Sequence, residues 1–165
     1  MEASAPRLVY SNTDGAVHKI SSNGSVGGLI RNMNGDWIIG FNKPVGISTP
    51  LQAELWGILE GLHLALSHNF ERLQWQTDSA EALNLVSSPM TNCSPIALVR
   101  SIANLISKQW KIEFILIRRE ANVAADFLAK TTADTNERAQ TYIVTPQEII
   151  PLLQRDLYGP AFLRI

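Results

Sequence analysis

The chain has 165 residues, of which 45 % are hydrophobic, and its formal net charge is −1. This length fits one domain with enough apolar residues to form a core. The balanced charge argues against a basic nucleic-acid coat, so a polyanion must be held by local groups or by bound cations. A single cysteine excludes a disulfide framework, and no apolar run reaches membrane length. We expect a soluble, intracellular monomer without a membrane partner; nucleus, cytosol and organelle are not distinguished.

The first part of the chain predicts three antiparallel strands. Residues 7–14 and 25–31 form the first two, and Asn34-Gly35 then gives a strong hairpin signal. The third strand is expected to carry large apolar residues alternating along one face: Trp37, Ile39 and Phe41.

Helical periodicity begins after the third strand. Apolar residues recur at spacings of three and four over 50–68, and Thr49 with Gln52 forms a capping box at the start. The elements predicted beyond it are a strand over 71–77, helices over 79–87 and 94–109, a strand over 111–117 and a helix over 121–130. Residues 133–144 are expected to be a polar connector, and a last helix is expected to begin at Thr145-Pro146.

This order of elements predicts an α/β fold. Three strands in an antiparallel meander, extended by two parallel strands, give a five-stranded mixed sheet with helices on both faces. We expect one domain over residues 1–132, with its core in 7–132. Residues 133–165 then form the connector and a C-terminal helical extension, whose helix is a candidate surface for a protein partner.

Four acidic residues occupy positions where an isolated carboxylate would be costly. Asp14 and Asp78 end predicted strands, Glu54 lies in the first turn of a helix, and Asp126 lies in an Ala-rich helix beside apolar neighbours. Singly, the first three are explained by a turn, a favourable helix-dipole charge and a helix N-cap. Asp126 has no such simple explanation.

Together, the four carboxylates predict a metal site. Strand ends and the starts of facing helices meet at one edge of an α/β sheet, and there these side chains would converge. Carboxylate oxygens are the ligands that Mg²⁺ prefers, and two ions about 4 Å apart can hold the attacking and leaving oxygens of a phosphodiester.

Five motifs carry a resemblance to a known family: NTDGA at 12–16, GGLIR at 27–31, AELWG at 53–57, TDS at 77–79 and REANVAAD at 119–126. In these residues the chain resembles the ribonuclease H superfamily, in its plant and retroelement reverse-transcriptase-like branch, from about residue 7 to 132. The resemblance implies an RNase H-like fold and Mg²⁺-dependent cleavage, with Mn²⁺ as a substitute, of the RNA strand in an RNA/DNA hybrid. It implies that four residues are both catalytic and metal-binding: Asp14, Glu54, Asp78 and Asp126.

The same resemblance implies a set of substrate-binding candidates. Gly15 and Ala16 match the backbone segment that approaches the RNA minor groove, where 2′-hydroxyls identify RNA. Thr49 and Ser79 match polar positions near the nucleic acid, although both are equally good helix caps. Three further candidates complete the set: Arg118, Arg119 and Asn122.

The chain departs from the family pattern in its loops. Residues 20–24 replace a Gly-Asn-Pro-Gly loop, Pro50-Leu51 replaces an Asn-Asn pair, and residues 118–120 stand where many members carry a mobile histidine loop. We therefore expect cleavage that is slow in turnover. Two alternatives stay open: a non-catalytic module that binds nucleic acid or protein, and a detached RNase H domain of a retroelement polyprotein.

Overall fold

A mixed sheet organises the computed structural model, which describes residues 7–108, 110–131 and 139–158. The strands are β1 Leu8–Val17, β2 Asn23–Arg31, β3 Trp37–Ile47, β4 Arg72–Thr77, β5 Lys111–Leu116 and β6 Gln140–Tyr142. Their order across the sheet is β5-β4-β1-β2-β3-β6. β1 pairs antiparallel with β2 and parallel with β4, and β4 pairs parallel with β5. The predicted meander and parallel extension are confirmed, and β1 lies at the centre.

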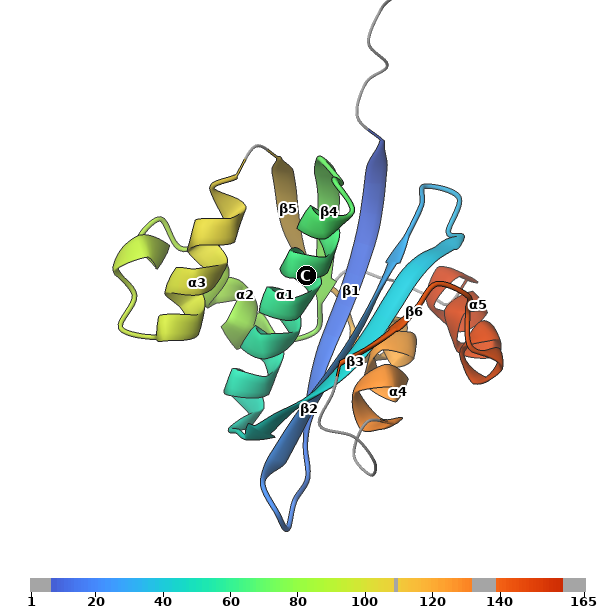
Figure 1. The fold of residues 1–165 in the computed structure, drawn as a ribbon, viewed down its shortest axis with the longest axis horizontal. Helices are drawn as coiled ribbons and strands as arrows, with labels where there is room; N and C mark the ends of the chain where they lie inside the picture. The colour runs from blue at the N-terminus through green and yellow to red at the C-terminus, as the bar shows by residue number, and fades with distance from the viewer. Residues whose placement is uncertain (1–6, 109, 132–138, 159–165) are drawn as a thin grey trace, which may run out of the picture.

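Helices cover both faces of the sheet, as predicted (Figure 1). α1 Pro50–Ser67, α2 Ala80–Ser87 and α3 Ala97–Ile106 lie on one side, and α4 Val123–Thr131 and α5 Ile150–Tyr158 lie on the other. Short 3₁₀ helices occupy Thr91–Cys93, Arg119–Ala121 and Gln147–Ile149. Among the described residues, none of these helices combines the length and the hydropathy needed to cross a membrane.

The sheet has six strands, and the prediction of five was wrong. The sixth, β6, lies in the segment predicted to be a polar connector and pairs antiparallel with β3. Trp37 Nε1 donates to the carbonyl oxygen of Tyr142 at 2.9 Å, and the Tyr142 hydroxyl contacts Asn42 Oδ1 at 3.2 Å. A strand of three residues is too short to show a period-2 pattern. Its position is therefore set by these long-range contacts and not by its local sequence.

A register shift in β3 corrects the predicted facing of its side chains. Ile30 pairs with Ile39 and Arg31 pairs with Trp37, so one residue is extra in β3. Such a bulge turns the side chains on either side of it to opposite faces. Ile39 therefore packs in the core on the α1 side, whereas Trp37 packs against the α4 side.

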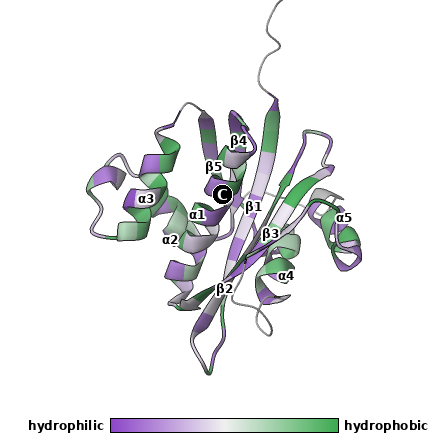
Figure 2. Ribbon diagram, viewed as in Figure 1, coloured by the Kyte–Doolittle hydropathy of each residue, from purple (hydrophilic) through white to green (hydrophobic). Residues whose placement is uncertain are grey.

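Close packing on both faces fixes the polar stretch of β1, residues 11–14. A Cβ on Gly15 would collide with the backbone of α1 at Ala53, and a Cβ on Gly27 would collide with α4 at Ala129, so both helices approach the sheet closely. Fully buried Trp75 donates from Nε1 to Thr13 Oγ1 at 3.0 Å. Along β1, hydrophobic residues at the start give way to hydrophilic ones (Figure 2). The polar stretch of β1 and Gly15 after it are thus held between α1 and α4.

Candidate active site

A cavity of about 390 Å³ opens where β1 ends and α1 and α4 begin. All four predicted acidic residues line it, together with Gly15, Ala16, Arg119 and Lys130. The predicted convergence of the four acids therefore occurs, but two of the predicted placements were wrong: Asp14 lies inside β1, which continues to Val17, and Glu54 lies just beyond the first turn of α1.

Three of the four acids form a tight group. Asp14, Glu54 and Asp78 each offer a carboxylate oxygen, and these oxygens lie within 4.8 Å of one another. Asp14 Oδ1 accepts a hydrogen bond from the Gly15 amide at 3.0 Å. Because the group draws on β1, α1 and the end of β4, the packing of the sheet sets its geometry.

Burial and mutual repulsion make this group a poor place for three negative charges. Burial, and then the charges of Glu54, Asp78 and Asp126, raise the pKa of Asp14 to about 11. Burial also raises the pKa of Glu54 to about 7, against the opposing effect of its hydrogen bond with Asp14. Asp14 therefore carries a proton that it shares with Glu54 when no cation is bound.

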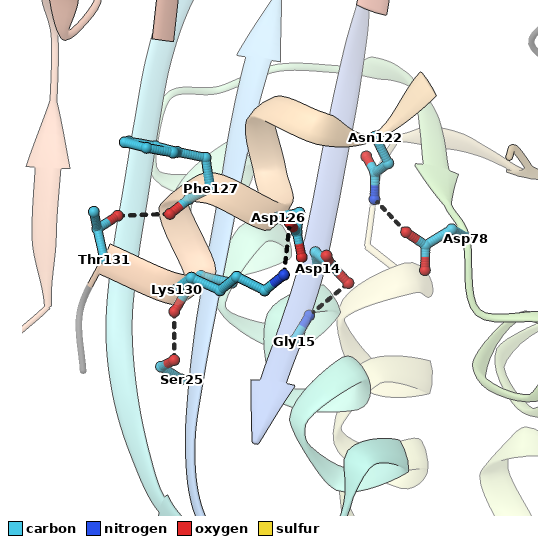
Figure 3. Close-up of polar contacts among 10 residues, drawn as sticks. Asp14, Gly15, Ser25, Asp78, Asn122, Asp126, Phe127, Lys130 and Thr131 are labelled. Atoms are coloured by element: carbon cyan, nitrogen blue, oxygen red, sulfur yellow. Dashed lines mark hydrogen bonds and ion pairs between the residues drawn. The ribbon is translucent and has the colours of Figure 1, made fainter. Parts of the chain in front are cut away.

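Asp126 lies apart from this group. Its side chain is 40 % exposed, and its Oδ2 accepts from Lys130 Nζ at 3.0 Å, one helical turn further along α4 (Figure 3). The charge of Asp126 still contributes to the raised pKa of Asp14. The sequence did not predict that Lys130 would neutralise one of the four acids.

Asn122 contacts the acidic group through its side-chain amide. It is fully buried, and its Nδ2 donates to Thr13 O at 3.0 Å and to Asp78 Oδ2 at 3.2 Å (Figure 3). Its Oδ1 accepts from Asn12 Nδ2 at 3.2 Å. The contacts with Thr13 and Asn12 fix the side chain of Asn122. Because the same side-chain amide also donates to Asp78, it holds that carboxylate in place.

The other substrate-binding candidates fall into three groups: residues that line the cavity, one exposed residue outside it, and two helix caps. Gly15, Ala16 and Arg119 line the cavity, whereas Arg118 is exposed and does not line it. Two side chains act as helix caps. Thr49 Oγ1 accepts from the Gln52 amide at 3.2 Å, and Ser79 Oγ accepts from the Ala82 amide at 3.2 Å.

The sequence did not predict a buried polar network that adjoins the site through the contact between Asn12 and Asn122. Asn12 Nδ2 donates to Gln76 Oε1 at 2.9 Å, and Asn12 Oδ1 accepts from Arg31 Nη2 at 2.8 Å. Arg31 is only 5 % exposed. An arginine that ends an apolar strand next to the acid-bearing strand was the available signal.

The donor set fits a divalent cation. Oxygen-only ligands suit Mg²⁺ or Mn²⁺, and a cation would replace the shared proton and relieve the repulsion between the carboxylates. Asp14, Glu54 and Asp78 would hold it. Within the described part of the chain, no other cluster of three or more His, Cys, Asp or Glu residues is close enough to do so.

The fold and the acidic cavity together define a ribonuclease H-type domain. Residues 12–132 match the family described as reverse transcriptase-like, and the chain belongs to that family. Membership places it in the ribonuclease H superfamily. A curated Arabidopsis thaliana relative, "Putative ribonuclease H protein At1g65750", is 30 % identical over 152 residues. The match covers 92 % of this chain and 24 % of the relative, so the chain spans about a quarter of that protein's length.

Solved structures share the fold at low sequence identity. The N-terminal RNase H domain of rv2228c from Mycobacterium tuberculosis superposes with a TM-score of 0.68 at 19 % identity, covering 78 % of this chain and 94 % of that one. LC11-RNase H1, solved in complex with RNA/DNA hybrid, gives a TM-score of 0.61 at 19 % identity, over 75 % and 94 % of the two chains.

Proposed function

We propose that the chain is a divalent-metal-dependent endoribonuclease that cleaves the RNA strand of RNA/DNA hybrids. The observation that carries the proposal is the group of three carboxylates within 4.8 Å, in a cavity that a fourth acid also lines. Family membership supports it, as does the shared fold with LC11-RNase H1, which was solved with a hybrid.

Two bound Mg²⁺ ions, with Mn²⁺ as a substitute, would supply an activated water and neutralise the charge that develops on the phosphodiester. Binding of a cation would displace the proton that Asp14 shares with Glu54 into solvent, so that both carboxylates could act as ligands. Asn122 keeps Asp78 directed at the group. Asp126 would complete the four acids if it released its ion pair with Lys130 and became a ligand.

Other residues of the cavity would bind the substrate. The backbone at Gly15 and Ala16 faces the minor groove of the hybrid, where the 2′-hydroxyls of the RNA strand are exposed. Arg119 provides a positive charge at the cavity for a phosphate. With a net charge of −1, the protein binds weakly and its affinity falls steeply with salt.

Two observations favour a second candidate, a binding module of the same fold without catalysis. Lys130 already neutralises Asp126, and no histidine lines the cavity in the described residues. Such a module would bind hybrid through the same surface and leave it intact.

Cleavage of a labelled 20-base-pair hybrid tests the proposal. Wild type and Asp14→Asn are compared in Mg²⁺, in Mn²⁺ and in EDTA, alongside single-stranded RNA, double-stranded RNA and double-stranded DNA. We expect metal-dependent cutting of the hybrid by wild type alone, with a burst of product before a slower steady state, because release limits turnover. Intact hybrid in both metals, with the protein folded and hybrid bound, would favour the binding module. Equal cutting of all four substrates would indicate a general nuclease.

A further inference from the structure

Helix α4, which carries Asp126, begins without a cap from its own N-cap residue. The carbonyl oxygen of Asn122 accepts from the Asp126 amide at 3.1 Å, which places Asn122 at the N-cap. An asparagine there ordinarily uses its side-chain oxygen to accept a hydrogen bond from one of the first helical amides. In this protein that oxygen accepts from Asn12, and the side-chain amide donates to Thr13 and Asp78. The side chain of Asn122 is thus committed to the acidic site.

Asp156, on α5, supplies the missing cap. Its Oδ1 accepts from the Val123 amide and its Oδ2 from the Ala124 amide, each at 3.0 Å. The carboxylate is 6 % exposed. A negative charge at this point also interacts favourably with the helix dipole of α4. Asp156 lies beyond residues 12–132, the segment that matches the family.

The surroundings of Asp156 link it to Asn122 by a second route. Burial raises the pKa of Asp156, while the hydrogen bonds from Ala124 and Val123 and the attraction of Arg31 oppose this. Arg31 in turn donates to Asn12, which contacts Asn122. Asp156 therefore borders the buried network on one side and the start of α4 on the other.

Resting on the proposed function, we propose that Asp156 is a positioning residue for the acidic site and acts through Asn122. Because α5 caps α4, the side chain of Asn122 is free to hold Asp78, and the first turn of α4 keeps Asp126 at the cavity. Without Asp156, the unpaired amide of Ala124, the second residue of the helix, draws the side chain of Asn122 back to cap its own helix. Asp78 then loses its amide contact.

A metal titration of the full chain tests this role. We expect Asp156→Ala to weaken Mn²⁺ binding, measured by calorimetry, by roughly tenfold, as for other residues that orient metal ligands. Asn122→Ala should weaken Mn²⁺ binding similarly. The double variant should bind no more weakly than Asn122→Ala alone, because Asp156 acts on the site through the side chain of Asn122 and that side chain is already absent. Asp156→Asn keeps one oxygen acceptor and should recover part of the affinity.

Leu152→Ala is the matched control, because Leu152 packs α5 against the same core and makes no cap. It should lower the melting temperature while leaving the Mn²⁺ affinity unchanged. An affinity unchanged in Asp156→Ala, or one lost equally in Leu152→Ala, would overturn the positioning role, as would additive effects in the double variant.

The side-chain amide signal of Asn122 in NMR separates this proposal from the proposed function. It is assigned by its loss in Asn122→Ala and measured without metal. The signal should shift in Asp156→Ala and stay in place in Leu152→Ala. If wild type neither binds metal nor cleaves hybrid, the proposed function fails, and the amide signal alone decides the positioning role. An unshifted signal in Asp156→Ala refutes it.

Discussion

The acidic site has a buried part, the group of Asp14, Glu54 and Asp78, and a more exposed part, Asp126. Negative charge is neutralised differently in the two parts. In the buried part, Asp14 is 6 % exposed and shares a proton with Glu54. In the more exposed part, Asp126 is half-buried as a residue, but its side chain is 40 % exposed and is paired with Lys130. Low dielectric inside the sheet leaves protonation or a cation as the means of neutralisation, whereas water and a lysine suffice at the surface.

This contrast indicates different roles for the two parts. The buried group is built around the central strand and cannot move without disturbing the core, so in the proposed function it would hold the more tightly bound cation. Asp126 can release Lys130 at little cost, since exposed ion pairs contribute about 0–1 kcal/mol. We therefore expect changes in the buried part to alter metal binding and stability, and changes in the exposed part to alter mainly catalysis.

Asp14→Asn should have the largest effect. We expect single-turnover cleavage of hybrid to fall by roughly three orders of magnitude, because a metal ligand contributes several kcal/mol to the transition state. The melting temperature in EDTA should be equal or higher, since an amide can still donate to Glu54 and brings no buried charge. The rise in melting temperature with Mg²⁺ should largely disappear.

Glu81→Gln is the control for this variant, because Glu81 is exposed in the first turn of α2 and outside the cavity. It should cleave as wild type does. Near-normal cleavage by Asp14→Asn would mean that the nuclease activity has another source.

Asp126→Asn should separate the two parts. Cleavage is expected to fall by roughly a hundredfold, about 2.7 kcal/mol of transition-state stabilisation. The rise in melting temperature with Mg²⁺ should persist, because Asp14, Glu54 and Asp78 still hold a cation. If this rise disappears as completely as in Asp14→Asn, the four acids act as one unit and the division into two parts is wrong.

The sequence predicted the α/β fold and the meeting of the acids because each rests on local signals. Alternation, the Asn34-Gly35 turn and the capping box of Thr49 are encoded over a few residues, and the helices and the first five strands form where these signals lie. Asp14 lies inside β1, three residues before its end, and Asp78 follows directly after β4; the parallel pairing of these two neighbouring strands brings the two acids together. The chain order was therefore enough to place all four acids in one cavity.

Features that depend on tertiary contacts could not be predicted in the same way. The three residues of β6 are fixed by Trp37 and Tyr142, and the bulge in β3 depends on pairing with β2. Asp156 caps a helix that begins 33 residues earlier. Its signal was an acid on the apolar face of α5, three residues beyond Leu153, and this spacing alone does not identify the partner.

The pH dependence of stability should reveal the buried part. The pKa of Glu54 is raised from 4.5 to about 7, so the folded state binds the proton more tightly than the unfolded state does. The resulting stabilisation is complete below about 4.5 and is lost as pH rises through about 7. The pKa of Asp14, raised to about 11, extends the loss to higher pH.

Melting temperatures in EDTA between pH 5 and pH 8 measure this effect. The melting temperature of wild type should fall by several degrees over this range, and that of Glu54→Gln should fall by less. Saturating Mg²⁺ displaces the proton, so it should remove this difference in pH dependence between the two proteins. Equal slopes for wild type and Glu54→Gln in EDTA would show that Glu54 does not titrate in this window.

Lys130→Ala should have the smallest effect and tests the exposed part directly. In the proposed reaction Lys130 competes with a cation for Asp126, so its removal should lower the Mg²⁺ concentration for half-maximal cleavage by about two- to threefold. Loss of an exposed pair one helical turn apart should change the free energy of unfolding by only about 0.3–0.5 kcal/mol. Lys43→Ala is the matched control, since Lys43 pairs with Glu60 at 2.8 Å and neither residue lines the cavity. It should leave the Mg²⁺ requirement unchanged. A higher Mg²⁺ requirement in Lys130→Ala would instead mean that the ammonium assists the reaction, by holding Asp126 in place or by binding the substrate phosphate.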